Sequence, residues 1–322
     1  MSASSLLPAD LQLFQRGWLS SNNVLCLGEQ PALIDTGHDK HAELTLHLVQ
    51  TALLGGPQLH TIAHTHLHSD HCGGTALLQQ AYLEARTLVA ASSWATVQHW
   101  DLQRLSYVLT GQHCRRFAAH GVLQPGSVVR LGNYDWEVHA TAGHDSDAVM
   151  LFEPRLRLLL AGDALWQSQL SIVFDELPRF DRDGFAGFEA TLAQIERLQP
   201  QVVVPGHGAA FGEGEGAAVT AAIASARKRI ALFRAQPEQH ARYGAKALIK
   251  YHLLDVEHMT LEAFHQWLAG APVFAELHAA LRGGISLEAW LEDILDELER
   301  KDAIWRRDGE IGDSPTVSRQ RL

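Results

Sequence analysis

One short segment of the 322-residue sequence gathers residue types that bind transition metals. Positions 64–71 run His-Thr-His-Leu-His-Ser-Asp-His, between a predicted strand and a predicted helix. Alternate residues of an extended chain point in the same direction, so His66 and His68 can converge on one ion. Asp70 and His71 stand where the helix is expected to begin, displaced toward a second ion. Imidazole and carboxylate groups are ligands that zinc, manganese and iron accept.

This cluster resembles the H-x-H-x-D-H signature of the metallo-β-lactamase superfamily, and further motifs of that superfamily occur in the expected order. They are Leu33-Ile34-Asp35-Thr36-Gly37 before the cluster, and Thr141-Ala142-Gly143-His144, Leu160-Ala161-Gly162-Asp163 and Val204-Pro205-Gly206-His207-Gly208 after it. The resemblance covers roughly residues 20–212. Because the motifs occur together and in the same order as in the superfamily, the resemblance is specific to it.

The resemblance implies two metal ions, zinc in the first instance, with iron or manganese as alternatives. It assigns the ligands as follows: His66, His68 and His144 to the first ion, Asp70, His71 and His207 to the second, and Asp163 to both. It also implies hydrolysis by a hydroxide that bridges the ions, with Asp70 as the catalytic residue that orients the hydroxide or carries its proton. Asp35 is expected to support a histidine ligand through a hydrogen bond from behind the site.

Aromatic residues near the motifs are candidates for a substrate pocket. Trp166 and Phe174 follow Asp163, and Tyr107 and Phe117 lie in the long insertion at 92–125. Cys72 is expected to pack rather than to bind metal.

The third motif departs from the glyoxalase II pattern that the cluster otherwise resembles. That pattern continues G-H-T-x-G-H, whereas here Gly143-His144 continues to Ala148 without a second histidine. The departure argues against a glutathione thioester as the substrate. The expected substrate is therefore a small ester, thioester, lactone or related carbonyl compound. Two other activities on the same fold stay open: an iron-dependent dioxygenase, and a phosphodiesterase or ribonuclease.

The elements that must position these residues alternate between short strands and helices. Strands are predicted at 24–27, 32–35, 59–64, 87–91, 128–131, 135–140, 148–152, 157–161 and 201–204, and helices at 40–54, 70–83 and 185–198. The motif residues follow strand ends. With the resemblance, this pattern implies an α/β fold, the four-layer αββα metallo-β-lactamase sandwich.

The sequence changes character near residue 215. Residues 1–215 are predicted to form the catalytic domain, and residues 216–322 a helical, winged-helix-like domain with a frayed tail after about residue 306. From residue 213 onward there are 14 Lys and Arg against 17 Asp and Glu, a balance that disfavours nucleic-acid binding. We expect this part to wall the active site or to form a homodimer contact.

Composition, charge and cysteine spacing favour a protein of the reducing cytoplasm. The net charge of −11 disfavours nucleic acid and anionic membranes as partners. No apolar run is long enough to span a bilayer, and the first ten residues lack the pattern of a secretion signal. The 3 cysteines are far apart in sequence, which argues against a disulfide framework.

Overall fold

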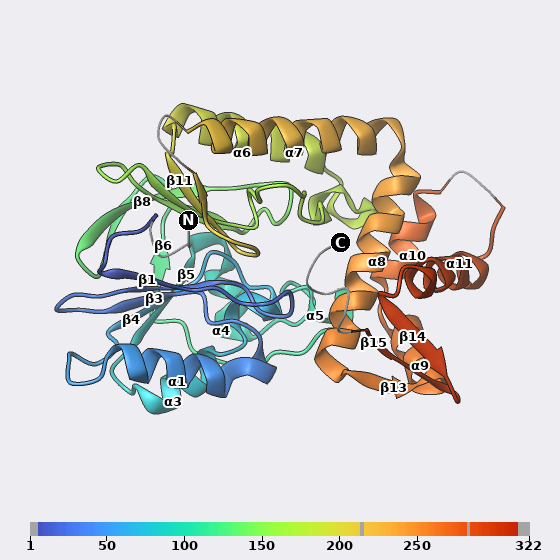
Figure 1. Ribbon diagram of the computed structural model, residues 1–322, viewed down its shortest axis with the longest axis horizontal. Coiled ribbons are helices and arrows are strands. Elements are labelled where there is room, and N and C mark those ends of the chain that lie inside the picture. The colour runs from blue at the N-terminus through green and yellow to red at the C-terminus, as the bar shows by residue number, and fades with distance from the viewer. Residues whose placement is uncertain (1–5, 213–215, 282–283, 315–322) are drawn as a thin grey trace.

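Two six-stranded sheets lie face to face in the computed structural model, which describes residues 6–212, 216–281 and 284–314 (Figure 1). The first sheet has the order β1 (Leu11–Phe14), β2 (Asn23–Cys26), β3 (Ala32–Ile34), β4 (Thr61–Ala63), β5 (Arg86–Ala90) and β6 (Gly121–Leu123). The second has the order β12 (Phe211–Gly212), β11 (Val202–Pro205), β10 (Leu158–Gly162), β9 (Val149–Glu153), β8 (Tyr134–Ala140) and β7 (Val128–Leu131).

Helices cover the outer face of each sheet. Apolar side chains of both sheets, such as Ile34 and Trp136, fill the space between them. On the outside, Val49 of α1 and Leu78 of α3 are buried against the first sheet, and Phe188 of α6 is buried against the second. The covering helices are α1 (Ala42–Ala52), α3 (Thr75–Ala81), α6 (Gly184–Leu198) and α7 (Ala217–Ala235). The order helix, sheet, sheet, helix confirms the predicted sandwich (Figure 1).

The predicted helix at 70–83 is wrong as a single element, because it divides into α2 (Ser69–Cys72) and α3. Gly73 and Gly74 separate the two helices at a point where the chain presses against the loop that follows β3. A Cβ atom on Gly73 would lie 2.3 Å from the backbone nitrogen of Asp39, and one on Gly74 would lie 2.6 Å from the carbonyl oxygen of Thr36. Only glycine permits this approach, which fixes the histidine-rich loop against the loop that carries Asp35.

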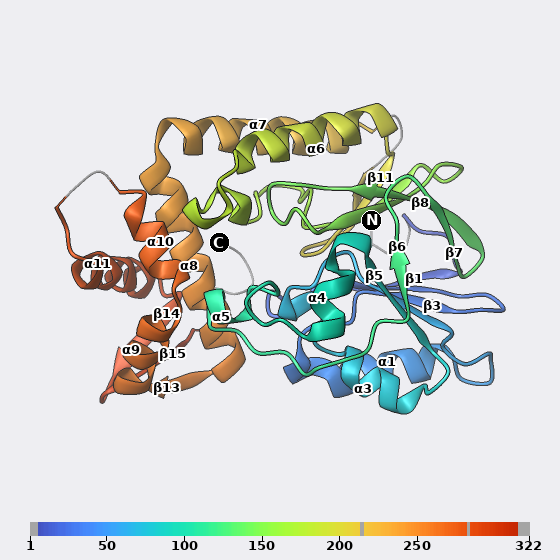
Figure 2. The same ribbon diagram turned by 180° about the vertical axis from the view of Figure 1, so that it is seen from behind.

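The insertion after β5 contains two short helices, α4 (Trp94–His99) and α5 (Tyr107–Thr110), joined by irregular chain. In both views α5 lies beside the lower half of the long helix α8 (Pro237–Val256) (Figures 1 and 2). Leu109 belongs to the same apolar core as α8, and Trp267 Nε1 donates a hydrogen bond to the Gly111 carbonyl at 3.1 Å. The remaining short helices are η2 (Asp39–His41), η3 (Ala91–Ser93), η4 (Phe174–Glu176) and η5 (Pro178–Phe180).

The helices and the small sheet of the C-terminal part form most of one apolar core, which also includes Leu109, Phe174 and Leu177. Its elements are α8 (Pro237–Val256), β13 (His258–Thr260), α9 (Leu261–Gly270), α10 (Val273–Ala279), α11 (Leu287–Arg300), β14 (Ile304–Arg307) and β15 (Glu310–Asp313), with the sheet order β13–β15–β14. Helix α11 buries one stripe, which includes Trp290, Ile294 and Leu298, in this core. By contrast, α7 packs on α6 in the core of the second sheet, so the C-terminal elements of the other core begin with α8. The division of the chain into two domains at residue 215 stays a prediction.

The predicted frayed tail after residue 306 is wrong for residues 306–314, which complete a β-hairpin. Asp308 and Gly309 form its turn with φ values of 53° and 78°, the left-handed conformation that tight hairpins require. Ile311 is fully buried in the C-terminal core. Arg306 pairs with Glu299 at 2.8 Å on α11. Residues 315–322 lie outside the described residues.

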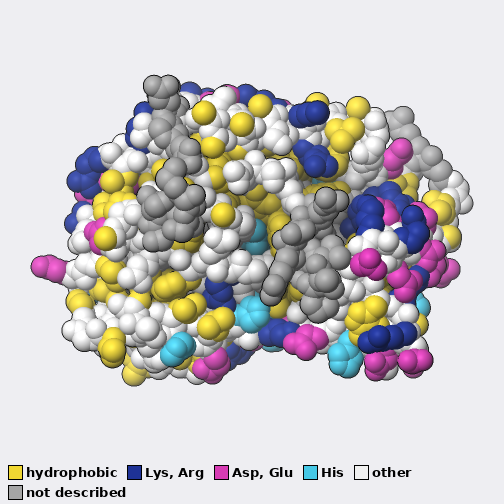
Figure 3. All heavy atoms as spheres, viewed as in Figure 1, with side chains coloured by type: hydrophobic (Ala, Val, Ile, Leu, Met, Phe, Trp, Pro, Cys, Tyr) yellow, Lys and Arg dark blue, Asp and Glu magenta, His cyan; other side chains and the backbone are white. Residues whose placement is uncertain are grey.

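Acidic and basic side chains are mixed over the C-terminal part. On the face in Figure 3 a group of basic side chains near the right edge lies among acidic ones. Within the described residues, no helix is both long enough and apolar enough to cross a membrane.

Candidate metal centre

The predicted ligands come together at one edge of the sandwich, where strands of both sheets end. β3 pairs in parallel with β4, and β10 pairs in parallel with β11, so within each pair the carboxyl ends share an edge. Asp35 follows β3 and the histidine-rich loop follows β4. Asp163 follows β10, and His207 lies two residues beyond β11. His144 follows β8.

Three imidazoles form the first group of donor atoms. The Nε2 atoms of His66 and His144 are 3.3 Å apart, and His68 Nδ1 lies 3.1 Å from the first and 3.0 Å from the second. Nitrogen ligands of a tetrahedral zinc ion, each about 2.0–2.1 Å from the metal, stand about 3.3 Å from one another. The spacing of the three nitrogens therefore fits one zinc ion.

Hydrogen bonds behind the rings fix where their protons lie. His144 Nδ1 donates to the Ile172 carbonyl at 2.8 Å, so its Nε2 carries a lone pair. Thr65 Oγ1 donates to Asp35 and accepts from His66 Nδ1 at 3.1 Å, so Nε2 of His66 also carries a lone pair. Two lone pairs that face each other at 3.3 Å repel unless a cation lies between them. Burial and the neighbouring His144 lower the pKa of His68 to about 3, which keeps this imidazole neutral as well.

Asp70, His71 and His207 form a second group of donor atoms. His71 Nδ1 donates to Asp35 Oδ2 at 2.8 Å, and its buried Nε2 has no hydrogen-bond partner among the described residues. That Nε2 atom lies 3.7 Å from Asp70 Oδ2, and His207 Nε2 lies 2.9 Å from the same oxygen. Burial opposes charge on His71, yet the carboxylates of Asp70, Asp163 and Asp35 outweigh it and raise the pKa of His71 well above its usual value. The surroundings of His71 therefore attract positive charge.

Asp163 lies between the two groups. Its Oδ2 atom is 3.5 Å from His144 Nε2 in the first group, and its Oδ1 atom is 3.5 Å from His71 Nε2 in the second. Trp166 Nε1 donates to Oδ1 at 3.1 Å and fixes the carboxylate. One carboxylate thus reaches both groups, which is the placement that a bridging ligand needs.

Asp35 supports the site from behind, where the sequence placed it. Its carboxylate accepts hydrogen bonds from the Thr65 backbone at 2.9 Å, from Thr65 Oγ1 at 2.8 Å and from His71 Nδ1 at 2.8 Å. Asp35 itself has a φ of 55°, a backbone conformation that aspartate tolerates better than most residues. His64 Nε2 bonds to Thr75 Oγ1 at 2.9 Å, so this histidine points away from both donor groups.

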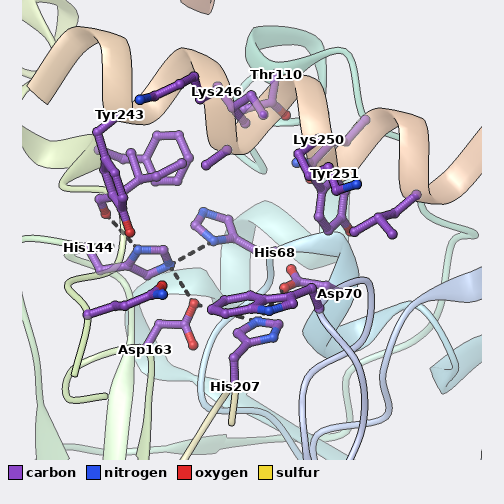
Figure 4. A pocket seen from close by; sticks show the side chains of 18 of the residues that line it. His68, Asp70, Thr110, His144, Asp163, His207, Tyr243, Lys246, Lys250 and Tyr251 are labelled. Atoms are coloured by element: carbon purple, nitrogen blue, oxygen red, sulfur yellow. Dashed lines mark hydrogen bonds and ion pairs between the residues drawn. The ribbon is translucent and has the colours of Figure 1, made fainter. Parts of the chain in front are cut away.

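A cavity of about 610 Å³ opens beside the two donor groups (Figure 4). Trp166 and Phe174 line it, and the Phe174 ring is centred 5.1 Å from the His68 ring. Their role in a substrate pocket stays a prediction. The prediction that Tyr107 and Phe117 line the pocket is wrong. Both are buried in a core with Cys72, under the histidine-rich loop rather than beside it.

Residues that the sequence analysis missed form much of the cavity wall. Trp18 stacks on the His207 ring at 5.5 Å, although it precedes the histidine-rich loop by almost fifty positions. Helix α8 supplies the opposite wall through Tyr243, Lys246 and Tyr251 (Figure 4). Spacing by three and four residues marks one face of α8, but nothing in the sequence indicates what that face contacts.

A family model described as the metallo-beta-lactamase superfamily matches residues 16–207. The chain belongs to the metallo-beta-lactamase superfamily, as its motifs predicted. The fold and the buried histidine and aspartate groups accordingly define a metal-binding enzyme of this superfamily.

Among curated proteins, acyl-coenzyme A thioesterase MBLAC2 of Homo sapiens and of Bos taurus is 28% identical over 159 residues, 46% of this chain. The match covers 56% of the length of those relatives. Among solved structures, a metallo-beta-lactamase family protein from Thermus thermophilus has a TM-score of 0.58 at 20% identity, over 96% of this chain and 99% of that one. A beta-lactamase domain protein from Burkholderia ambifaria has a TM-score of 0.53 at 19% identity, over 95% and 96%. Both structures share the fold along nearly the whole chain.

Proposed function

We propose that the protein is a hydrolase with two zinc ions that cleaves a thioester of a small molecule into a carboxylic acid and a thiol. The observation that carries the proposal is the pair of buried donor groups, in each of which the three possible ligand atoms lie within 4.8 Å of one another. His66, His68 and His144 would hold one ion, Asp70, His71 and His207 the other, and Asp163 both. Metal ions bound there would polarise the scissile carbonyl and lower the pKa of a water molecule.

The side chains of the chain itself orient and enclose the reactants. Burial opposes ionisation of Asp70, but His71 and His207 outweigh it and lower its pKa to about 2. Asp70 is therefore a carboxylate at neutral pH, and it lines the cavity, where it accepts a hydrogen bond from the attacking water and aligns it. Trp18, Trp166 and Phe174 exclude bulk water from the same space.

A thioester is favoured over the other carbonyl substrates by the relatives and by the cavity. The curated relatives are named acyl-coenzyme A thioesterases. The cavity is large enough for a ligand of that kind, because small-molecule sites usually measure about 300–1,000 Å³. Ala148, which stands where glyoxalase II enzymes have a second histidine, argues against glutathione as the thiol.

The C-terminal part is proposed to be winged-helix-like and to wall the active site. The order helix, strand, three helices and two strands, with β15 in the centre of the sheet, supports the first statement. The position of α8 on the cavity supports the second.

Metal content and a substrate panel test the proposal together. The full chain is purified from zinc-supplemented cultures, analysed for metals, and assayed with acetyl-coenzyme A, an ester, a lactone and a phosphodiester. About two zinc ions per chain with cleavage of the thioester is the expected result. One iron per chain, with oxygen consumption and no hydrolysis, would establish the dioxygenase instead, and cleavage of only the phosphodiester would establish a nuclease.

A further inference from the structure

One face of α8 forms the wall of the cavity opposite the metal centre. Tyr243, Ala247, Lys250 and Leu254 succeed one another at intervals of three or four residues, so they lie along the same side of the helix. Figure 4 shows this side of the helix turned toward His68 and His144. The cavity therefore extends from the donor groups along more than two turns of α8.

Contacts at its C-terminal end hold α8 in place. Lys40 Nζ donates hydrogen bonds to the carbonyl oxygens of Leu254 at 3.1 Å and Asp255 at 2.6 Å, the last turn of the helix. The Tyr251 hydroxyl lies 2.9 Å from Ser69 Oγ, within the loop between His68 and Asp70. The wall is thus attached both to η2 and to the loop that carries the donor atoms.

Most polar side chains of this wall are bonded to protein groups behind it. The Tyr243 hydroxyl donates to the Leu170 carbonyl, and Thr110 Oγ1 donates to the Ser106 carbonyl at 2.8 Å. Lys250 Nζ donates to the Ala303 carbonyl at 2.6 Å and pairs with Asp313. Lys246 and Lys301 both pair with Glu297, at 2.9 and 2.7 Å.

With those bonds made, the wall offers a ligand mainly aromatic rings and aliphatic carbon. Ile172, Phe174, Leu248, Leu254 and Leu298 add apolar side chains. A coenzyme A chain would lose hydrogen bonds from its amides to water here. The lysines that could meet its phosphates are already paired with Glu297 and Asp313. An aliphatic chain has no such loss.

We propose that the space between the donor groups and α8 binds the aliphatic acyl group of the substrate, with Ala247 limiting how long that group can be. This inference rests on the proposed thioester hydrolysis. Burying one methylene group is worth about fourfold in kcat/KM, so activity should rise with acyl length until the cavity is full. Ala247 has the smallest side chain on this face of α8, so a larger residue there would take up space that the acyl group needs.

The test measures kcat/KM of the zinc-loaded full chain with acetyl-, butanoyl-, octanoyl- and dodecanoyl-coenzyme A. We expect a rise with chain length in the wild type. Ala247→Phe should lower the ratio of the dodecanoyl to the acetyl value about tenfold or more. Ala224→Phe, at an exposed alanine of α7 outside the cavity, is the matched control and should leave the profile unchanged.

Two further measurements separate the possible failures. Calorimetry with dodecyl-coenzyme A, a thioether that cannot be hydrolysed, should give about tenfold weaker binding to Ala247→Phe than to wild type. Acyl N-acetylcysteamine thioesters replace coenzyme A by a short thiol and should keep the same dependence on acyl length.

If acetyl-coenzyme A and all other thioesters stay intact, the proposed function itself fails. If acetyl-coenzyme A is cleaved but the wild-type profile is flat, or Ala247→Phe leaves it unchanged, only the acyl-site inference is overturned. The inference is also overturned if Ala247→Phe alters the preference between the two thiols rather than between acyl lengths, because the cavity would then hold the thiol.

Discussion

The Nε2 atoms of His66 and His144 face each other at 3.3 Å, and both carry lone pairs because the opposite nitrogen of each ring donates a hydrogen bond. His66 is on the loop after β4 and His144 on the loop after β8, so the two sheets of the sandwich meet at this contact. A positive ion between these nitrogens removes the repulsion and joins the sheets. Metal binding and the stability of the fold are therefore expected to be coupled.

Removal of metal should destabilise the protein. A ligand that binds only the folded state at a thousand times its dissociation constant adds about 4 kcal/mol to the free energy of unfolding. We expect the midpoint of thermal unfolding to fall when a chelator strips the protein and to return on addition of zinc. Equal midpoints with and without zinc, at concentrations that saturate the site, would contradict the assignment of the donor groups.

Asp70→Ala should lower kcat by about 100-fold or more while the protein stays folded, because the carboxylate both holds metal and aligns the attacking water. Steady-state kinetics, metal analysis and circular dichroism check the prediction. Asp135→Ala, at an exposed aspartate of β8, serves as the control. A folded Asp70→Ala protein with wild-type turnover would refute the mechanism.

Asp35→Asn should weaken zinc binding about 10- to 100-fold, the usual effect of losing a carboxylate behind a histidine ligand. Asparagine adopts the left-handed backbone conformation at this position without strain, so the loop should keep its shape. Competition with a chromogenic chelator measures the affinity. Unchanged affinity would mean that the bond between Asp35 and His71 has only a structural role.

His240 should make stability fall in acid, independently of the metal centre. It is buried between the rings of Phe185 and Phe233, each 5.1 Å away, and burial lowers its pKa from 6.5 to about 4. Below pH 6.5 the unfolded chain takes up a proton that the folded protein does not. The contribution of neutral His240 to the free energy of unfolding is therefore fully present above pH 6.5. It is lost as the pH falls toward 4, by about 3 kcal/mol in total.

Urea unfolding of the metal-free wild type and of His240→Leu, at pH 7.5 and pH 4.5, tests this prediction. Both proteins share every other titrating group, so the difference between their pH dependences isolates His240. The variant should lose less stability on acidification than the wild type, by about 2–3 kcal/mol. Parallel pH profiles of the two proteins would show that His240 does not contribute.

The sandwich and the donor groups were predictable because their signals are local. Each motif residue follows a strand, and parallel neighbours such as β3 and β4 or β10 and β11 bring their carboxyl ends to one edge. β4 belongs to the first sheet and β10 and β11 to the second, so it was the resemblance to the ordered motifs of the superfamily that predicted that His66, Asp163 and His207 come together. The Asp-Gly pair at 308–309 was an equally local signal for a hairpin, but the charged residues around it concealed it.

The cavity wall was not predictable in this way, because it depends on contacts between distant segments. Trp18 reaches His207 from the N-terminal region, and Tyr243 approaches from α8. Tyr107 and Phe117 were wrongly predicted to line the pocket because closeness in sequence was taken as closeness to the site. They are close in sequence to the histidine-rich loop, but their side chains pack beneath it.

The hydrogen bond between Tyr251 and Ser69 limits how this enzyme can diverge. Ser69 lies between His68 and Asp70, so a change at Tyr251 reaches two donor residues at once. Ala247, one turn earlier on the same helix, lines the cavity. New substrate preferences can therefore arise by mutation along α8 without loss of metal, provided that Tyr251 is retained. Selection would thus retain Tyr251 while position 247 varies.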